Sequence, residues 1–246
     1  MESMEISLPV KTIFILLLLF LCGGIFSETL PSDKIRFRLW VLEDEMPSLD
    51  KNADDKSTGS LPEKLSPDEP FYMPAVRNLQ SLAPFMLEGM LYGWNYSYTP
   101  SDKTRMVSEY FEATSVREDT VKNKDIHWTE FELKEGKYTC WVEYERTLEQ
   151  RYNKQWWNSV KCHKISGTGY APVADGTDGI KAAVLDAIKK GVREYARSIE
   201  KNKPKEINGT ILLAEKDPRV YIDHGQFVAD LDFFLYVDKI ERYTQF

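Results

Sequence analysis

Histidine and cysteine are scarce in this sequence, which holds three of each among its 246 residues. The histidines are His127, His163 and His224, and none is spaced from another histidine or from a cysteine as metal ligands usually are. Cys162 is adjacent to His163, but neighbouring residues of a strand point to opposite faces of the sheet. The sequence therefore predicts no metal site, and it favours structural or surface roles for the histidines.

The motifs that mark common enzyme and nucleotide sites are also missing. Gly167-Thr168-Gly169 precedes a predicted helix, but no Gly-Lys-Ser/Thr follows and the third glycine of the dinucleotide fingerprint is absent. We expect these glycines to provide the backbone angles of a strand-to-helix corner. No Gly-x-Ser-x-Gly elbow occurs in the chain. No catalytic residue and no cofactor are predicted, and the protein is not expected to be an enzyme.

The chain also lacks an excess of positive charge. It carries 32 Lys and Arg against 39 Asp and Glu, which gives a formal net charge of −7. Proteins that bind nucleic acid need a basic face for the phosphate backbone, so this balance argues against DNA or RNA as a partner. The same acidity gives no attraction to anionic lipid.

One long hydrophobic run is present, at residues 12–22, and it is shorter than the roughly 20 apolar residues that span a bilayer. It follows a single cation and leads to two glycines and to Ser27, a small residue at a cleavage point. Residues 1–27 are therefore predicted to be a signal peptide, and the protein is expected in the periplasm or the cell envelope. Membrane attachment would need the uncleaved segment or a lipid on Cys22. A lipid on Cys22 is not favoured, because Leu21 stands where a lipoprotein signal has a small residue.

The remaining chain begins with a strand pattern within residues 28–46. Residues 47–70 are rich in Asp, Lys, Ser and Pro, a composition typical of a polar linker or long loop. Apolar side chains at helical spacing predict a helix over 74–92, with a kink at Pro84. Alternating aromatic and polar residues then predict an antiparallel meander, with strands at 94–98, 106–115, 126–133 and 138–148.

A second helical stripe predicts a helix over 180–200, and strands are predicted at 210–213 and 227–238. The fold class is therefore α+β, with antiparallel sheets covered by two amphipathic helices. The pattern favours two α+β units, residues 71–150 and 151–246. The same order of predicted elements occurs twice. Strand 35–42 is followed by a helix and then by strands, as is the first strand of the second unit. This repetition indicates two β-α-β-β units.

Residues 138–165 have the pattern of a hairpin whose turn is centred on Arg151. This register places Cys140 opposite Cys162, and opposed Cβ atoms in an antiparallel ladder lie about 4.5–5.5 Å apart, near what a disulfide requires. Because cysteines of exported proteins tend to pair, we predict a Cys140–Cys162 disulfide. The alternative is two buried thiols that act as small hydrophobic side chains.

The segment around the second predicted helix resembles a known protein family. Gly169-Tyr-Ala-Pro-Val, a Gly/Asp loop and the helix AAVLDAIKKGV at 182–192 resemble the N-terminal module of flagellar assembly protein T and the small envelope lipoproteins grouped with it. The likeness covers residues 160–200. It implies a non-enzymatic envelope protein that acts through protein contacts at the flagellar motor, and it supplies no catalytic residues. The linker at 47–70 departs from the pattern of that module.

These observations predict an exported binding or assembly protein with an envelope protein as its partner. The alternative is a secreted ligand-binding protein or hydrolase with a pocket beneath the helix around Pro84. The predicted partner contacts are exposed aromatic residues of the middle sheet, which give large contact area at low entropic cost: Trp94, Tyr96, Trp141 and Trp157. Of the adjacent Trp156 and Trp157, one is expected in the core and the other on the surface.

Overall fold

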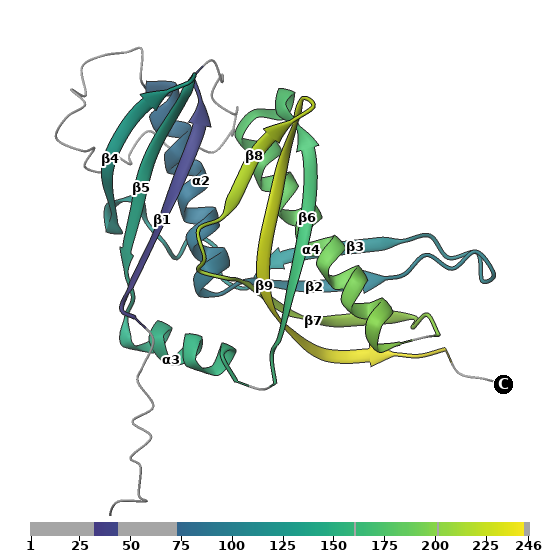
Figure 1. Cartoon of the computed structure of the whole chain (residues 1–246). Coiled ribbons are helices and arrows are strands. Elements are labelled where there is room, and N and C mark those ends of the chain that lie inside the picture. Colours follow the sequence, from purple (N-terminus) through teal and green to yellow (C-terminus); the bar gives the residue numbers. More distant parts are fainter. Residues whose placement is uncertain (1–31, 44–72, 160, 201, 244–246) are drawn as a thin grey trace, which may run out of the picture. The chain divides into compact units, whose positions relative to one another are not determined.

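The computed structural model describes residues 32–43, 73–159, 161–200 and 202–243 (Figure 1). The predicted signal peptide, the linker at 47–70 and Cys22 lie outside these residues. The helices are α2 (Met73–Leu91), α3 (Leu148–Trp157) and α4 (Gly176–Ile199), with 3₁₀ turns at Asn123–Asp125 and Val173–Asp175. The strands are β1 (Lys34–Leu42), β2 (Trp94–Thr99), β3 (Tyr110–Ser115), β4 (Ile126–Lys134), β5 (Lys137–Glu145), β6 (His163–Pro172), β7 (Glu206–Leu213), β8 (Arg219–Asp223) and β9 (Gln226–Glu241).

The strands form two antiparallel sheets, which confirms the predicted α+β class. A three-stranded sheet has the order β1-β5-β4, and a six-stranded sheet has the order β3-β2-β7-β9-β6 with β8 paired to β9. The predicted single meander is therefore wrong, because its first hairpin, β2-β3, belongs to the larger sheet and its second, β4-β5, to the smaller. A tight turn at Glu135-Gly136 joins β4 to β5, whereas residues 100–109 join β2 to β3, and the two hairpins are not hydrogen-bonded to each other.

The larger sheet takes strands from both predicted units. β2 pairs with β7, with Trp94 opposite Ile211, so residues 71–150 and 151–246 share one sheet. The second half has the order β6-α4-β7-β8-β9, one strand more than the predicted β-α-β-β unit, and α4 packs on β6 and β9. The first half does not form such a unit, because β1 pairs with β5 in the smaller sheet. The prediction of two β-α-β-β units is wrong for that half.

Helix α2 forms where the apolar stripe predicted it. Its buried side chains include Val76, Leu79, Leu82, Met86 and Met90, which follow the 3.6-residue period. The helix continues through Pro84 as one element. It ends at Leu91, and Gly93 follows at φ 75°, a left-handed conformation that glycine adopts without steric penalty.

Helix α4 lies directly against the backbone of β6 (Figure 1). A Cβ atom added to Gly167 would lie 2.1 Å from the Ala187 carbonyl oxygen, and one added to Gly169 would lie 1.9 Å from the Ala183 oxygen. Both glycines stand inside β6, so the predicted strand-to-helix corner is wrong. They are needed for the close approach of the helix and not for unusual backbone angles.

The buried side chains form one continuous cluster. α2 packs against β1 of the smaller sheet, β7 of the larger sheet and helix α4, so it joins the cores of both sheets. Phe233 and Leu235 of β9 point into this core, while Phe234 and Tyr236 alternate with them and lie on the opposite face of the sheet. Helix α3 lies against that opposite face.

Candidate functional site

Helix α3 occupies the segment that the sequence pattern assigned to a hairpin. β5 pairs with β1 and β4, and β6 pairs with β9, so β5 and β6 are not partners. The helix begins at a capping box in which the Gln150 amide N–H donates to Thr147 Oγ1 at 3.3 Å and the Thr147 N–H donates to Gln150 Oε1 at 2.8 Å. This Thr-x-x-Gln signal is a recognised helix start and was present in the sequence.

Because β5 and β6 are not paired, the register that placed Cys140 opposite Cys162 and suggested a disulfide does not occur. Cys140 lies in β5 opposite Leu39, and Cys162 lies in the turn before β6. Both thiols are free in the structure. Burial raises the pKa of the Cys140 thiol to about 12, which keeps it protonated and unreactive at neutral pH.

One face of α3 is fixed to the rest of the protein by polar contacts. Gln150 Nε2 donates to the hydroxyl of Tyr92 at 2.8 Å and to that of Tyr144 at 3.2 Å. Asn153 Nδ2 donates to the Leu91 carbonyl oxygen at 2.8 Å. These bonds attach the helix to the C-terminal end of α2 and to β5.

A buried ion cluster fixes the same face to the larger sheet. Glu215 Oε1 lies 2.5 Å from Arg146 Nη2 and 2.7 Å from Lys154 Nζ, so two cations share one carboxylate. Lys154 Nζ also lies 4.5 Å from the centre of the Phe234 ring. Burial lowers the pKa of the Lys154 amine, and the hydrogen bond and charge of Glu215 oppose that shift.

Helix α3 also borders a groove of about 520 Å³, whose lining includes the anchoring residues Gln150 and Asn153. The groove lies between α3, the end of α2, the loop after β3 and the outer face of β7 and β9. We call it the α3 groove. Its lining residues are Tyr92, Val116, Arg117, Glu149, Gln150, Tyr152, Asn153, Trp156, Trp157, Thr210, Tyr236 and Asp238.

Trp156 is the central ring of the α3 groove. Its ring centroid lies 5.1 Å from that of Trp157 at an interplanar angle of 86° and 5.2 Å from that of Tyr236 at 67°. Both are edge-to-face arrangements, which aromatic pairs favour. Trp157 is 3% exposed, whereas Trp156 is 41% and Tyr152 is 55% exposed. One tryptophan is thus in the core and the other on the surface, as predicted, and the exposed one is Trp156.

Three charged residues line the groove, Arg117, Glu149 and Asp238. The Arg117 guanidinium lies 4.8 Å from the centre of the Tyr92 ring, and its Nη2 is 3.3 Å from Glu149 Oε1. Asp238 forms no hydrogen bond or ion pair with any residue in the described part of the chain. The same holds, within those residues, for the hydroxyls of Tyr152 and Tyr236. A ligand therefore finds an exposed ring beside an unpaired carboxylate.

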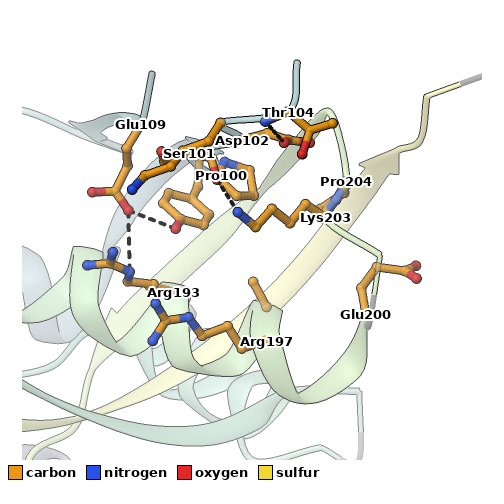
Figure 2. Close-up of a pocket in the computed structure, with 13 residues that line it drawn as sticks. Pro100, Ser101, Asp102, Thr104, Glu109, Arg193, Arg197, Glu200, Lys203 and Pro204 are labelled. Carbon is orange, nitrogen blue, oxygen red and sulfur yellow. Dashed lines mark hydrogen bonds and ion pairs between the residues drawn. The ribbon is translucent and has the colours of Figure 1, made fainter. Parts of the chain in front are cut away.

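A second hollow, of about 320 Å³, lies between the loop after β2 and the C-terminal part of α4 (Figure 2). Its charged side chains largely satisfy one another. Glu109 accepts a hydrogen bond from the Tyr98 hydroxyl at 2.9 Å and pairs with Lys189 and Arg193 at 3.2 and 3.4 Å. Burial alone would raise the pKa of Glu109, but these donors and charges lower it below its ordinary value. Lys203 Nζ donates to the Ser101 carbonyl oxygen at 2.6 Å.

The predicted contact residues do not form a surface. Trp94, Tyr96 and Trp157 are 2%, 3% and 3% exposed, so their assignment as exposed contacts is wrong. β2 is an inner strand between β3 and β7, and Trp94 and Tyr96 face the core. Trp141 is half-buried in β5, with the Arg36 guanidinium 4.2 Å from its ring centre.

Three further features bear on the predicted alternatives. The hollow against Leu82 and Met86 of α2, near Pro84, measures about 10 Å³, which is about the room that one water needs. Within the described residues, no three His, Cys, Asp or Glu side chains are placed to hold a metal ion. None of the helices in the described ranges has the length and hydrophobicity needed to cross a membrane.

A protein-family model matches residues 25–243, most of the chain, and the chain therefore belongs to that family. A protein of Treponema pallidum (strain Nichols) that bears the name "uncharacterized protein" is 29% identical over 171 residues, which are 70% of this chain and 71% of the relative. No solved structure gives a significant match. Neither match bears the name of flagellar assembly protein T, so that resemblance stays a prediction.

Proposed function

We propose that this chain is an exported cell-envelope protein that binds a protein partner in the α3 groove. The observation that carries the proposal is the exposure of Trp156 and Tyr152, whose rings line the groove while polar contacts of Gln150, Asn153 and Lys154 hold α3 in place. Exposed aromatic rings on a rigid, concave surface are typical of binding hot spots. The signal-peptide pattern of residues 1–27 supports export.

The chemistry of the groove supports binding over hydrolysis. Its lining contains no histidine, cysteine or serine. The threonine hydroxyl in the lining, that of Thr210, donates to Asn95 Oδ1 at 3.2 Å, so its proton is directed at an amide oxygen and not at a general base. The hollow against Leu82 and Met86 of α2 is too small to support a substrate pocket beneath that helix.

The resemblance of residues 160–200 to the module of flagellar assembly protein T extends the proposal to a partner at the flagellar motor. These residues form β6 and α4. β6 is the last strand in the order of the larger sheet, α4 packs on that sheet, and the outer face of its strands β7 and β9 forms one wall of the groove. A partner would therefore contact the side of the sheet that α4 does not cover.

Site-specific photocrosslinking in cells tests this proposal. We expect Tyr152→p-benzoylphenylalanine to give one adduct of defined mass in the envelope fraction, because this side chain points from α3 into the groove. Trp156→Ala should abolish the adduct, since it removes the central ring of the site.

The matched control places the same probe at Tyr221, an exposed tyrosine of β8 outside the groove. It should give no adduct of that mass. Equal adducts at both positions, or none at Tyr152, would contradict the α3 groove as the binding site.

A further inference from the structure

Several aromatic rings outside the groove are covered by cations of the chain itself. Three such pairs are Arg36 over Trp141 at 4.2 Å, Lys190 over Tyr170 at 4.2 Å and Arg219 over Tyr221 at 5.3 Å, each measured to the ring centre. All are within the roughly 6 Å over which the negative face of a ring attracts a cation. Within the lining of the α3 groove, Arg117 covers Tyr92 in the same way.

A carboxylate completes each of these pairs. Arg36 lies 2.9 Å from Glu143, Lys190 lies 2.7 Å from Asp186, Arg219 lies 3.7 Å from Asp230, and Arg117 lies 3.3 Å from Glu149. The chain thus repeats one three-part arrangement of ring, cation and carboxylate. In each case the carboxylate holds the cation that the ring attracts.

The rest of the lining of the α3 groove has two of these three parts, rings and a carboxylate. It offers the exposed ring of Trp156, the ring of Tyr236 and the carboxylate of Asp238. Within the described residues no cation lies over Trp156, Tyr152 or Tyr236, and none pairs with Asp238. The charged residues that line the groove are Arg117, Glu149 and Asp238, and Arg117 is already held by Tyr92 and Glu149.

We propose that the α3 groove binds an arginine side chain of a basic partner segment, which stacks on the exposed surface of the contacting Trp156 and Tyr236 rings and pairs with the carboxylate of Asp238. Arginine fits better than lysine because its planar guanidinium stacks on rings and pairs with a carboxylate through two N–H groups at once. The net charge of −7 also favours a basic partner. This inference rests on the proposed function and names the chemistry of its partner.

Nuclear magnetic resonance of the purified protein tests the inference through the indole N–H of Trp156, assigned with Trp156→Phe. The probe is the tripeptide acetyl-Gly-Arg-Gly-amide at millimolar concentrations, the range in which a contact by one side chain saturates. We expect a saturable shift of the Trp156 signal. The citrulline tripeptide, which is neutral and nearly the same shape, should give little shift.

Asp238→Asn should weaken binding of the arginine tripeptide about tenfold, because it removes the charge from the hydrogen bonds to the guanidinium. The matched control is Asp232→Asn on the same strand, since Asp232 does not line the groove. It should leave the affinity unchanged, and a high salt concentration should weaken the arginine complex of the unmodified protein.

Equal shifts with arginine and citrulline, or an unchanged affinity in Asp238→Asn, would overturn the inference. If the Trp156 signal shifts only with a saccharide such as chitotriose, the groove is a sugar site and the cation is excluded. If neither tripeptide shifts the signal while the Tyr152 crosslink persists, the arginine inference fails and the binding function stands. If the crosslink is absent as well, both fail.

Discussion

At the scale of single residues, Glu88 shows how one carboxylate holds a distant loop. Its Oε1 accepts the backbone N–H groups of Thr120 and Val121 at 2.8 and 3.2 Å. Burial raises the pKa of Glu88 above its ordinary 4.5, and the two N–H donors oppose that shift without cancelling it. The charges of Asp119 and Glu118 raise the pKa further. The charged form of Glu88 is therefore less favourable in the folded protein than in the unfolded chain.

Glu88→Gln tests this balance. A raised folded pKa means that the folded state binds the proton more tightly, so the free energy of unfolding falls as pH rises from 4.5 through the folded pKa. Glutamine keeps an Oε1 acceptor for both N–H groups and has no charge to desolvate. We expect thermal melts at neutral pH to show an equal or higher Tm for the variant and a smaller decrease in Tm above pH 4.5.

Glu145→Gln is the control, because the Glu145 side chain is 67% exposed. Its pH profile should match that of the unmodified protein. A lower Tm of Glu88→Gln at neutral pH would show that the N–H bonds to a charged oxygen outweigh the effect of burial.

At the scale of elements, the contact between α4 and β6 depends on the absence of side chains. Gly169→Ala would place a methyl group against backbone atoms of α4, which cannot move aside as a flexible side chain could. We expect a loss of about 3 kcal/mol in the free energy of unfolding, the upper part of the usual range for overpacking. Chemical denaturation measures it.

Thr168→Ala is the matched control within the same strand, because Thr168 points to the opposite face of β6. It should lose less than about 1 kcal/mol. A similar loss in both variants would mean that strand propensity, and not the close approach of the helix, decides the stability of this contact.

The helices and strands with strong periodicity could be predicted from the sequence, but α3 could not be separated from a strand in the same way. α4 and α2 carry apolar stripes over five or more turns, and the alternating face of β9 is equally clear. In the segment 148–157, Tyr152 and Trp156 share even-numbered positions with a strand pattern, although their spacing of four is also helical. The capping box at Thr147 was the signal that distinguishes the two.

The sequence could indicate some of the side chains that line the α3 groove, but it could not show that they come together in one groove. The contrast between Trp156 and Trp157 follows from their adjacency, but which of them is exposed depends on the packing of α3 over Phe234 and Tyr236. Asp238 lies about 80 residues from α3, at an irregular point of the β7–β9 pairing. No local pattern brings those residues together, because their meeting depends on the strand order of the larger sheet.

At the scale of the whole molecule, the cluster of Arg146, Lys154 and Glu215 connects the two sheets. Arg146 follows β5 of the smaller sheet, and Glu215 follows β7 of the larger one. Arg146 also donates to the Ser32 carbonyl oxygen at 2.7 Å before β1. Glu215 is the one carboxylate of the cluster, so it compensates two buried positive charges.

Glu215→Gln and Lys154→Met should therefore have unequal effects on stability. Glu215→Gln leaves two buried cations without a counter-charge, and we expect a loss of about 3 kcal/mol in the free energy of unfolding. Lys154→Met leaves Arg146 paired one to one with Glu215 and should change stability by less than about 1 kcal/mol. Chemical denaturation compares them, and equal losses would contradict the shared-carboxylate account.

The position of β9 in the larger sheet has a consequence for biogenesis. This strand comes last among the described strands, yet it pairs with β6, β7 and β8. A chain that leaves the ribosome from its N-terminus exposes β6 and β7 well before the strand that joins them, so the larger sheet closes only when residues 226–241 have emerged. Under the export that we propose, this order keeps the larger sheet open while the earlier residues are translated, and an open sheet can pass through a narrow channel.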